Sequence, residues 1–112
     1  MPGWAGAVID TAKLTGYLLA LDHPTGGAKA ALLLACGFEP SLPDVLAGAL
    51  RRIAEVNDVA GVVHTQFGVK YVVDGTPYTP SGRLLPVRTV WIAEINTLVV
   101  PRFVTAYPIR QT

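Results

Sequence analysis

The sequence predicts an α+β fold in which two to three N-terminal helices pack on one face of a C-terminal four-stranded antiparallel sheet. Two observations lead to this prediction. Apolar side chains recur at helical spacing through the first half of the chain, up to about residue 58. From residue 60 onward the chain breaks into short runs rich in valine and aromatic residues, separated by turn residues. Helices followed by consecutive strands are typical of the α+β class.

One packed domain is expected over residues 1–112. Hydrophobic residues make up 51% of the chain and charged residues 15%, a composition that favours a packed core over a disordered chain. The helical half covers residues 11–58 and the sheet half covers residues 60–108, while residues 1–10 are a candidate flexible N-terminus. We find no internal repeat, low-complexity tract or linker that would indicate a second domain.

The first two helices are indicated by residues typical of helix ends. Asp10 is placed to cap a first helix over residues 11–21. Proline and paired glycines then mark a loop over residues 22–27. A second helix is predicted over residues 28–36, with Gly37 as its C-terminal stop.

The third helix has the clearest pattern of the three. Ser41 is expected to cap it, and Pro43 lies early in its first turn. Arg51, Arg52 and Glu55 are expected to face water. The apolar side chains that form its buried stripe are Val45, Leu46, Ala49, Leu50, Ile53 and Val56.

Four strands are expected in the second half of the chain. Residues 61–66 and 68–74 are predicted to form a hairpin, because both runs are rich in valine and aromatic residues. Three prolines and a glycine make residues 76–86 a loop or an irregular hairpin arm. Residues 87–95 and 100–107 are the last two predicted strands.

Composition and charge favour a cytoplasmic site of action and an anionic partner. No apolar run approaches the roughly 18 residues that a membrane crossing needs, so we expect no transmembrane segment and no membrane partner. No secretory signal is expected either. The single cysteine, Cys36, excludes an internal disulfide and is expected in the core. Residues 66–112 hold five basic and two acidic side chains, against four basic and six acidic ones in residues 1–65.

The loop before the second helix is the first candidate site. Gly26 and Gly27 leave the backbone open at a helix start, where free N–H groups and the helix dipole favour an anion. Lys29 follows in the first turn, and His23 lies in the loop as a candidate proton-transfer group. The alternative is an ordinary glycine-rich connection between two helices, with His23 acting as a cap.

The last strand provides the second candidate site. Strict alternation places Val104 and Ala106 on one face, and both are small and apolar, as a helix-covered face requires. Phe103, Thr105 and Tyr107 are then expected on the uncovered face. Two hydroxyl groups would therefore lie on the same exposed face of the sheet.

Two basic residues of the sheet extend this candidate site. Lys70 alternates with apolar neighbours and is expected on the uncovered face, whereas the pattern around Arg88 leaves its face undecided. A face that carries Lys, Thr, Tyr and Arg can bind phosphates and stack bases; the alternative is an ordinary solvated face. We find no histidine–carboxylate cluster with metal-ligand spacing, so no metal and no cofactor are predicted.

Six short motifs occur in order between residues 12 and 108. They are Lys13-Leu14-x-x-Tyr17-Leu18-Leu19, His23-Pro24-x-Gly26-x-x-Lys29-Ala30, Gly37-Phe38, Phe67-Gly68-x-Lys70-Tyr71, Val90-Trp91 and Pro101-Arg102-x-Val104-Thr105-Ala106-Tyr107-Pro108. Together these motifs resemble a bacterial family of unknown function, DUF6883. Two positions depart from the family pattern, since Ala20 and Phe103 stand where an asparagine and a leucine are common.

The order of helices and strands and the closing Thr-x-Tyr-Pro strand are also similar to the barnase–EndoU–colicin–RelE group of ribonuclease toxins. This resemblance of fold implies a metal-independent endoribonuclease toxin, in which the 2′-hydroxyl of RNA attacks the adjacent phosphorus. It implies RNA, such as tRNA or mRNA, as substrate and an antitoxin or immunity protein as partner. The alternative function is a non-catalytic protein- or RNA-binding module. The oligomeric state is left open.

The resemblance implies three kinds of role for the candidate residues. A histidine acts as general base or acid, cations neutralise the charge on the phosphate, and hydroxyl groups position the scissile phosphate. These roles fall to His23 as base or acid, to Lys29, Lys70 and Arg88 as cations, and to Thr105 and Tyr107 as hydroxyls, with Tyr107 also a candidate proton donor.

Overall fold

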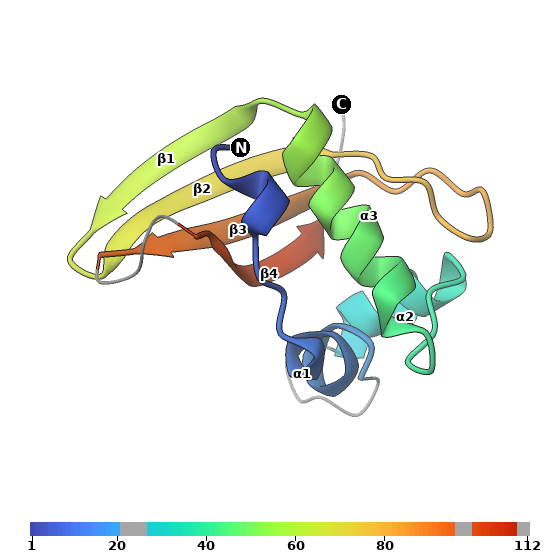
Figure 1. Ribbon diagram of the computed structural model, residues 1–112. Coiled ribbons are helices and arrows are strands. Elements are labelled where there is room, and N and C mark those ends of the chain that lie inside the picture. Colours follow the sequence, from blue (N-terminus) through green and yellow to red (C-terminus); the bar gives the residue numbers. More distant parts are fainter. Residues whose placement is uncertain (21–26, 96–99, 110–112) are drawn as a thin grey trace.

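The computed structural model describes residues 1–20, 27–95 and 100–109, and it confirms the predicted α+β class (Figure 1). Helices come first and strands follow. The helical elements are η1 Trp4–Gly6, α1 Thr11–Lys13, the π-helical turn η2 Leu14–Leu18, α2 Gly27–Ala35 and α3 Pro43–Val56. The strands are β1 Val59–Thr65, β2 Gly68–Gly75, β3 Val87–Glu94 and β4 Arg102–Pro108.

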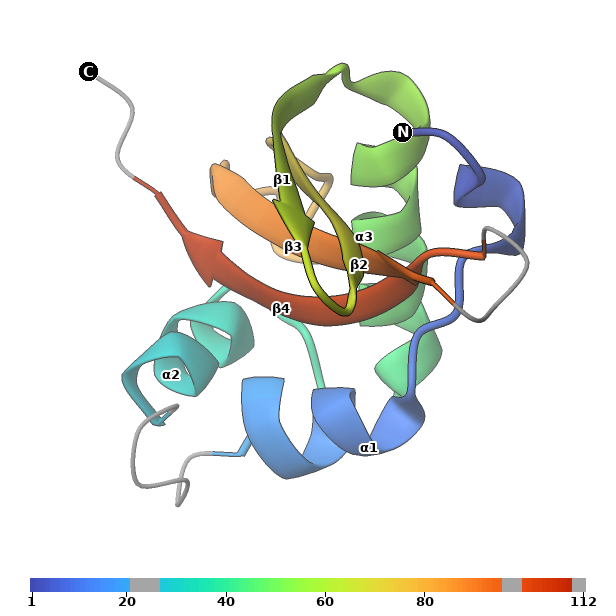
Figure 2. The same ribbon diagram turned by 90° about the vertical axis from the view of Figure 1, so that its left-hand side faces the viewer.

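The four strands form one antiparallel sheet in the order β1-β2-β3-β4. Helix α3 crosses one face of this sheet, while α1, η2 and α2 lie beneath the β4 edge (Figures 1 and 2). We call the face away from α3 the open face. Within the described residues no helix has the length and the apolar character needed to cross a membrane.

The core lies between α3, the N-terminal helices and the covered face of the sheet. Trp91 and Phe103 pack edge to face on neighbouring strands, with ring centroids 5.4 Å apart. Cys36 is fully buried, as expected. The largest fully buried apolar side chains are Trp91, Phe38, Phe103, Leu14, Leu18, Leu46 and Ile53.

The first helix begins as predicted and then changes from α-helical to π-helical hydrogen bonding. The Asp10 side chain accepts a hydrogen bond from the Ala12 N–H at 3.0 Å and caps the helix. After Lys13 the chain enters the π-helical turn, in which the Leu19 N–H reaches back to the Leu14 carbonyl at 2.8 Å. The helical residues end at Leu18, so the predicted helix is too long over residues 19 and 20, and residue 21 lies outside the described residues.

Helix α2 ends at the glycine that the sequence predicts as a stop. Gly37 has a φ of 96°, and the Phe38 N–H returns to the Leu33 carbonyl. Helix α3 differs from its prediction at its start. Ser41 does not cap it; Leu42 precedes the first residue, Pro43, and its side chain has no oxygen that could act as a cap. Proline suits this first position because an N–H there would have no partner within the helix.

The buried stripe of α3 is turned slightly from the predicted one. Val45 and Val56 are exposed, and Ala54 is buried in their place. Arg51 was expected in water, yet it is half-buried and its Nη2 donates to the Ala7 carbonyl at 2.9 Å. Ala7 is buried against α3, so its carbonyl needs a hydrogen-bond donor from the protein, and Arg51 provides it.

Residues 1–10 are joined to both halves of the molecule. The Met1 ammonium donates to the Ala54 carbonyl of α3 at 2.8 Å. Farther along, the Val8 N–H donates to the Pro101 carbonyl and the Phe103 N–H donates to the Val8 carbonyl, at 2.9 and 2.8 Å. Val8 thus forms a parallel bridge beside the start of β4.

A β-bulge in β4 corrects the predicted alternation. Val90 pairs with Thr105 and Trp91 pairs with Phe103, so one step on β3 corresponds to two steps on β4. Val104 is the extra residue, and it shifts the parity of the strand. Phe103 therefore lies in the core at 1% exposure, and its predicted place on the uncovered face is wrong.

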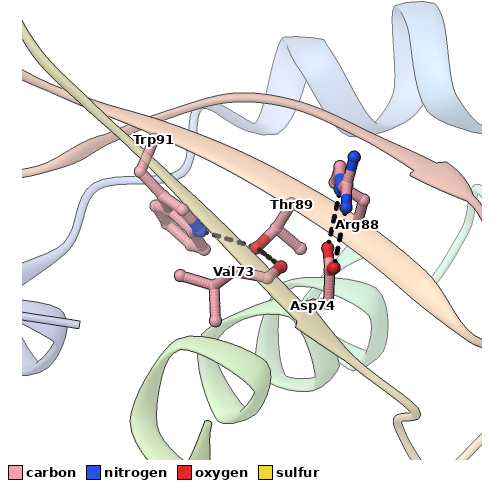
Figure 3. A network of polar contacts seen from close by, with 5 residues as sticks. All are labelled: Val73, Asp74, Arg88, Thr89 and Trp91. Atoms are coloured by element: carbon pink, nitrogen blue, oxygen red, sulfur yellow. Dashed lines mark hydrogen bonds and ion pairs between the residues drawn. The ribbon is translucent and has the colours of Figure 1, made fainter. Parts of the chain in front are cut away.

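One buried polar group links the sheet to its tryptophan (Figure 3). The Thr89 hydroxyl donates to the Val73 carbonyl at 2.8 Å and accepts the indole N–H of Trp91 at 2.8 Å. All three residues are fully buried. The hydroxyl satisfies a donor and an acceptor that have no access to water.

We predict that Thr89→Val destabilises the fold by about 1–3 kcal/mol, because the indole N–H loses its buried acceptor. Urea unfolding followed by circular dichroism measures the change. Thr76→Val, at an exposed loop position, is the matched control and should change the free energy of unfolding by less than about 0.5 kcal/mol. A Thr89→Val protein as stable as the wild type would contradict the role of the hydroxyl.

Two Gly→Ala substitutions should change the free energy of unfolding in opposite directions. Gly68 has a φ of 151°, and a Cβ there would lie 2.2 Å from the Ala93 carbonyl oxygen, so Gly68→Ala should cost about 2 kcal/mol or more. Gly48 is exposed within α3 and a Cβ would meet nothing within 4 Å, so Gly48→Ala should add about 0.5–1 kcal/mol. Thermal and urea unfolding of both variants test the pair.

Candidate functional site

Three neighbouring strands place a row of polar side chains across the open face of the sheet. Asp74 on β2 is the register partner of Arg88 on β3, and Arg88 is the register partner of Tyr107 on β4. Partners in register point to the same face, so the three side chains lie side by side. Arg88, which the sequence could not assign to a face, is thus on the open face.

The row begins with a two-point ion pair (Figure 3). Arg88 Nε and Nη2 donate to Asp74 Oδ1 and Oδ2 at 2.8 and 2.9 Å. The guanidinium hydrogen bonds lower the pKa of Asp74 below its ordinary value, with burial opposing the change. The pKa of Arg88 is raised, first by Asp74 and then by a hydrogen bond to Tyr107. Arg88 therefore joins the carboxylate to the phenol of β4.

Two residues of the helical half reach the same edge of the sheet. Lys29 of α2 donates a hydrogen bond from Nζ to the phenol oxygen of Tyr17, on η2. The same nitrogen lies 4.6 Å from the ring centroid of Tyr17 and 5.9 Å from that of Tyr107. One ammonium thus contacts both phenols of the site.

The contacts with Lys29 and Thr105 change the pKa of Tyr17. Its pKa is lowered, mainly by the hydrogen bond from Lys29, with burial opposing the change. A hydrogen bond with the Thr105 hydroxyl lowers it further, and the positive charges of Lys29 and Lys13 act in the same direction. The phenolate form of Tyr17 is therefore favoured relative to a tyrosine in water.

The β4 bulge forms one wall of a groove beside Tyr17. The groove has a volume of about 430 Å³ and runs between the first helical turns and the bulge. Lys13 Nζ donates to the Val104 carbonyl at 3.0 Å, which gives the bulged residue a partner outside the strand ladder. The groove is lined by Ala12, Lys13, Gly16, Tyr17, Val104 and Thr105.

Four of the six predicted site residues come together at this edge: Lys29, Arg88, Thr105 and Tyr107. They come from α2, β3 and β4. Tyr17 is hydrogen-bonded to Lys29 and Thr105, and Tyr107 contacts both Arg88 and Lys29. Lys70 shares the open face but pairs with Ile92, four residues along β2 from Asp74, which is about 13 Å along a strand. His23 lies outside the described residues.

Three further residues of the site, Tyr17, Lys13 and Asp74, were not predicted from the sequence. Asp74 could have been predicted, because it lies four residues after Lys70 on the same strand and alternation puts both on one face of the sheet. Helical periodicity gave no sign of Tyr17, because Tyr17 lies in a π-helical turn, where regular helical spacing does not predict the direction of a side chain. In the described part of the chain no three His, Cys, Asp or Glu side chains cluster as metal ligands.

We predict that Asp74→Asn lowers stability at neutral pH and that the loss disappears in acid. The folded-state pKa of Asp74 is depressed, so the ion pair stabilises the fold above the ordinary carboxyl pKa. That stabilisation is lost as the pH falls through the folded pKa. Urea unfolding of wild type and variant at a series of pH values measures the difference. A difference that stays constant into strong acid would contradict this assignment.

Comparison of the structure with solved structures finds a match over most of the chain. A chain described as "Contact-dependent growth inhibition toxin - immunity protein complex from Klebsiella pneumoniae 342" aligns with a TM-score of 0.72 and 16% identity. The match covers 91% of this protein and 99% of that chain. At this identity the comparison shows a shared fold.

Sequence comparisons give two further results. A search of curated proteins returned no significant match. The family model described as "Domain of unknown function (DUF6883)" matches residues 1–110, which is nearly the whole chain. The resemblance in the sequence motifs is thereby confirmed, and the chain belongs to the DUF6883 family.

Proposed function

We propose that this protein is a metal-independent endoribonuclease toxin that cleaves RNA by attack of a 2′-hydroxyl on the adjacent phosphorus. One observation carries the proposal: two phenols, a hydroxyl, an ammonium and a guanidinium meet at the β4 edge of the open face. These groups can themselves transfer protons and neutralise a phosphate, which is the chemistry that the reaction requires.

The cations keep free donors for a substrate. Lys29 uses one of its three N–H groups on Tyr17, and Arg88 uses Nε and Nη2 on Asp74 and a further N–H group on Tyr107, so both retain donors for a substrate. The Asp74 carboxylate holds the guanidinium in place before substrate binds. Charge developing on the phosphate would therefore meet cations that are already oriented.

The remaining roles follow the position of each side chain. The Thr105 hydroxyl is hydrogen-bonded to Tyr17 and would help to position the scissile phosphate, while Tyr107 is the candidate proton donor to the leaving oxygen. Lys70, farther along the same face, suits a contact with a more distant phosphate of the strand. His23 remains a candidate general base or acid on the grounds of its residue type.

The comparison with solved structures supports the toxin part of the proposal. The structure that shares this fold is named as a toxin–immunity protein complex. The same name supports an immunity protein as partner, which would suppress the activity in the producing cell. Family membership adds no activity, because the family itself is described only as a domain of unknown function.

Incubating the purified protein with total RNA in EDTA tests the proposal. We expect cleavage that leaves 2′,3′-cyclic phosphate ends, since no water enters the first step. Tyr107→Phe should reduce the rate by about 10²–10⁴-fold, as expected for a lost proton donor, and His23→Ala tests whether the loop histidine takes part. His64→Ala, at an exposed strand position away from the site, is the matched histidine control. Absence of cleavage at high enzyme concentration would refute the proposal.

A non-catalytic binding module is the second candidate function, and one observation favours it. Phe67 and Ile95 are 68% and 66% exposed at the far end of the sheet, where the Ile95 N–H donates to the Phe67 carbonyl at 3.1 Å. Neighbouring residues with exposed apolar side chains are typical of a partner-binding surface. A binding module would be tolerated when expressed without a partner in bacteria, whereas a toxin would not.

A further inference from the structure

We infer that the phenol oxygen of Tyr17 accepts the proton of the attacking 2′-hydroxyl, which makes Tyr17 a catalytic residue. The inference rests on the proposed ribonuclease function and adds a residue to it. Tyr17 belongs to the helical half of the molecule, whereas Thr105 and Tyr107 belong to the last strand. The site is therefore assembled from both halves of the fold.

Hydrogen bonding at Tyr17 suits a proton acceptor. Lys29 Nζ donates to the phenol oxygen and has no acceptor to offer in return. The Thr105 hydroxyl bonds to the same oxygen and can act as a second donor. A phenolate oxygen can accept both of these hydrogen bonds and still accept one from a substrate hydroxyl.

The charges around the phenol favour the same role. Lys29 and Lys13 both lie close enough to stabilise a negative oxygen, and the pKa of Tyr17 is lowered as a result. A base works best when its pKa approaches the working pH, because a larger fraction is then in the accepting form. Asp74, the carboxylate of the polar row, is paired with Arg88 and so does not oppose this effect.

Substrate can reach the phenol through the groove. Tyr17 and Thr105 both line its volume of about 430 Å³, which lies within the range of ligand pockets in proteins. Gly16, the residue before Tyr17, leaves open space where a Cβ would stand. A ribose entering beside Gly16 would meet the Tyr17 side chain on one side and the Thr105 side chain on the other.

The chemical step balances with two phenols. The 2′-hydroxyl proton passes to Tyr17, the 2′-oxygen forms a bond to phosphorus, and the bond from phosphorus to the 5′-oxygen breaks. The electron pair leaves with the 5′-oxygen, which takes the proton of the Tyr107 phenol. Arg88, hydrogen-bonded to Tyr107, stabilises the phenolate that remains. The products are a 2′,3′-cyclic phosphate and a 5′-hydroxyl, and one proton returned from Tyr17 to Tyr107 restores the site.

Kinetics of Tyr17→Phe on a short oligoribonucleotide, measured in EDTA over a range of pH, test the inference. We expect kcat to fall about 10²–10⁴-fold with KM nearly unchanged, and the rise of kcat with pH to disappear. Tyr78→Phe, a tyrosine that is 96% exposed on the 76–86 loop, is the matched control and should keep both the rate and the profile. Lys29→Gln should move the rise of kcat to higher pH, because Tyr17 loses the hydrogen bond that mainly lowers its pKa.

The outcomes separate this inference from the proposed function. If the wild type cleaves RNA and Tyr17→Phe keeps both its rate and its pH profile, the inference is wrong and the function stands. If the wild type does not cleave, both are overturned. If Tyr17→Phe fails to fold, Lys29→Gln decides: a shift of the profile to higher pH supports the inference, and an unshifted profile overturns it.

Discussion

The bulge at Val104 is the feature on which the arrangement of the site depends. One extra residue lets β4 place Phe103 against Trp91 in the core and still present Thr105 and Tyr107 on the open face. A regular strand would put Phe103 and Thr105 on the same side, so either the core or the site would lose its side chain. The bulge also lies opposite Lys13, which binds its carbonyl and brings the first helix to the sheet edge.

The polar site depends on pairing rather than on burial. Each phenol has a cation beside it, Lys29 for Tyr17 and Arg88 for Tyr107, and the Arg88 cation is itself oriented by Asp74. These contacts tie three strands and two helical elements into one connected set. Such a set can hold its geometry at the surface of a small domain, where a deep pocket would be difficult to build.

The sequence predicted the fold well because local signals and global architecture agree in this chain. Asp10, Gly37 and the valine-rich runs each mark an element end or type that the structure contains. Four of the predicted site residues, Lys29, Arg88, Thr105 and Tyr107, also come together in the structure, and residue type is what pointed to them. Phe103 was placed on the wrong face and Tyr17 was not predicted as a site residue, since a bulge and a π-helical turn each add a residue to a regular pattern. Such insertions respond to tertiary packing and leave no signature in periodicity.

The contacts of the site join residues that are far apart along the chain. Lys13 binds Val104 across 91 residues, whereas β1, β2 and β3 are joined to their sequence neighbours. The sheet can thus begin to form from local hairpins, while the cluster of phenols exists only after the two ends of the chain have met. Fraying of either the first turns or the last strand would dismantle the cluster without unfolding the middle of the sheet. The lifetime of the cluster therefore depends on how often the first helical turns separate from β4. A ligand that binds to both would lengthen that lifetime.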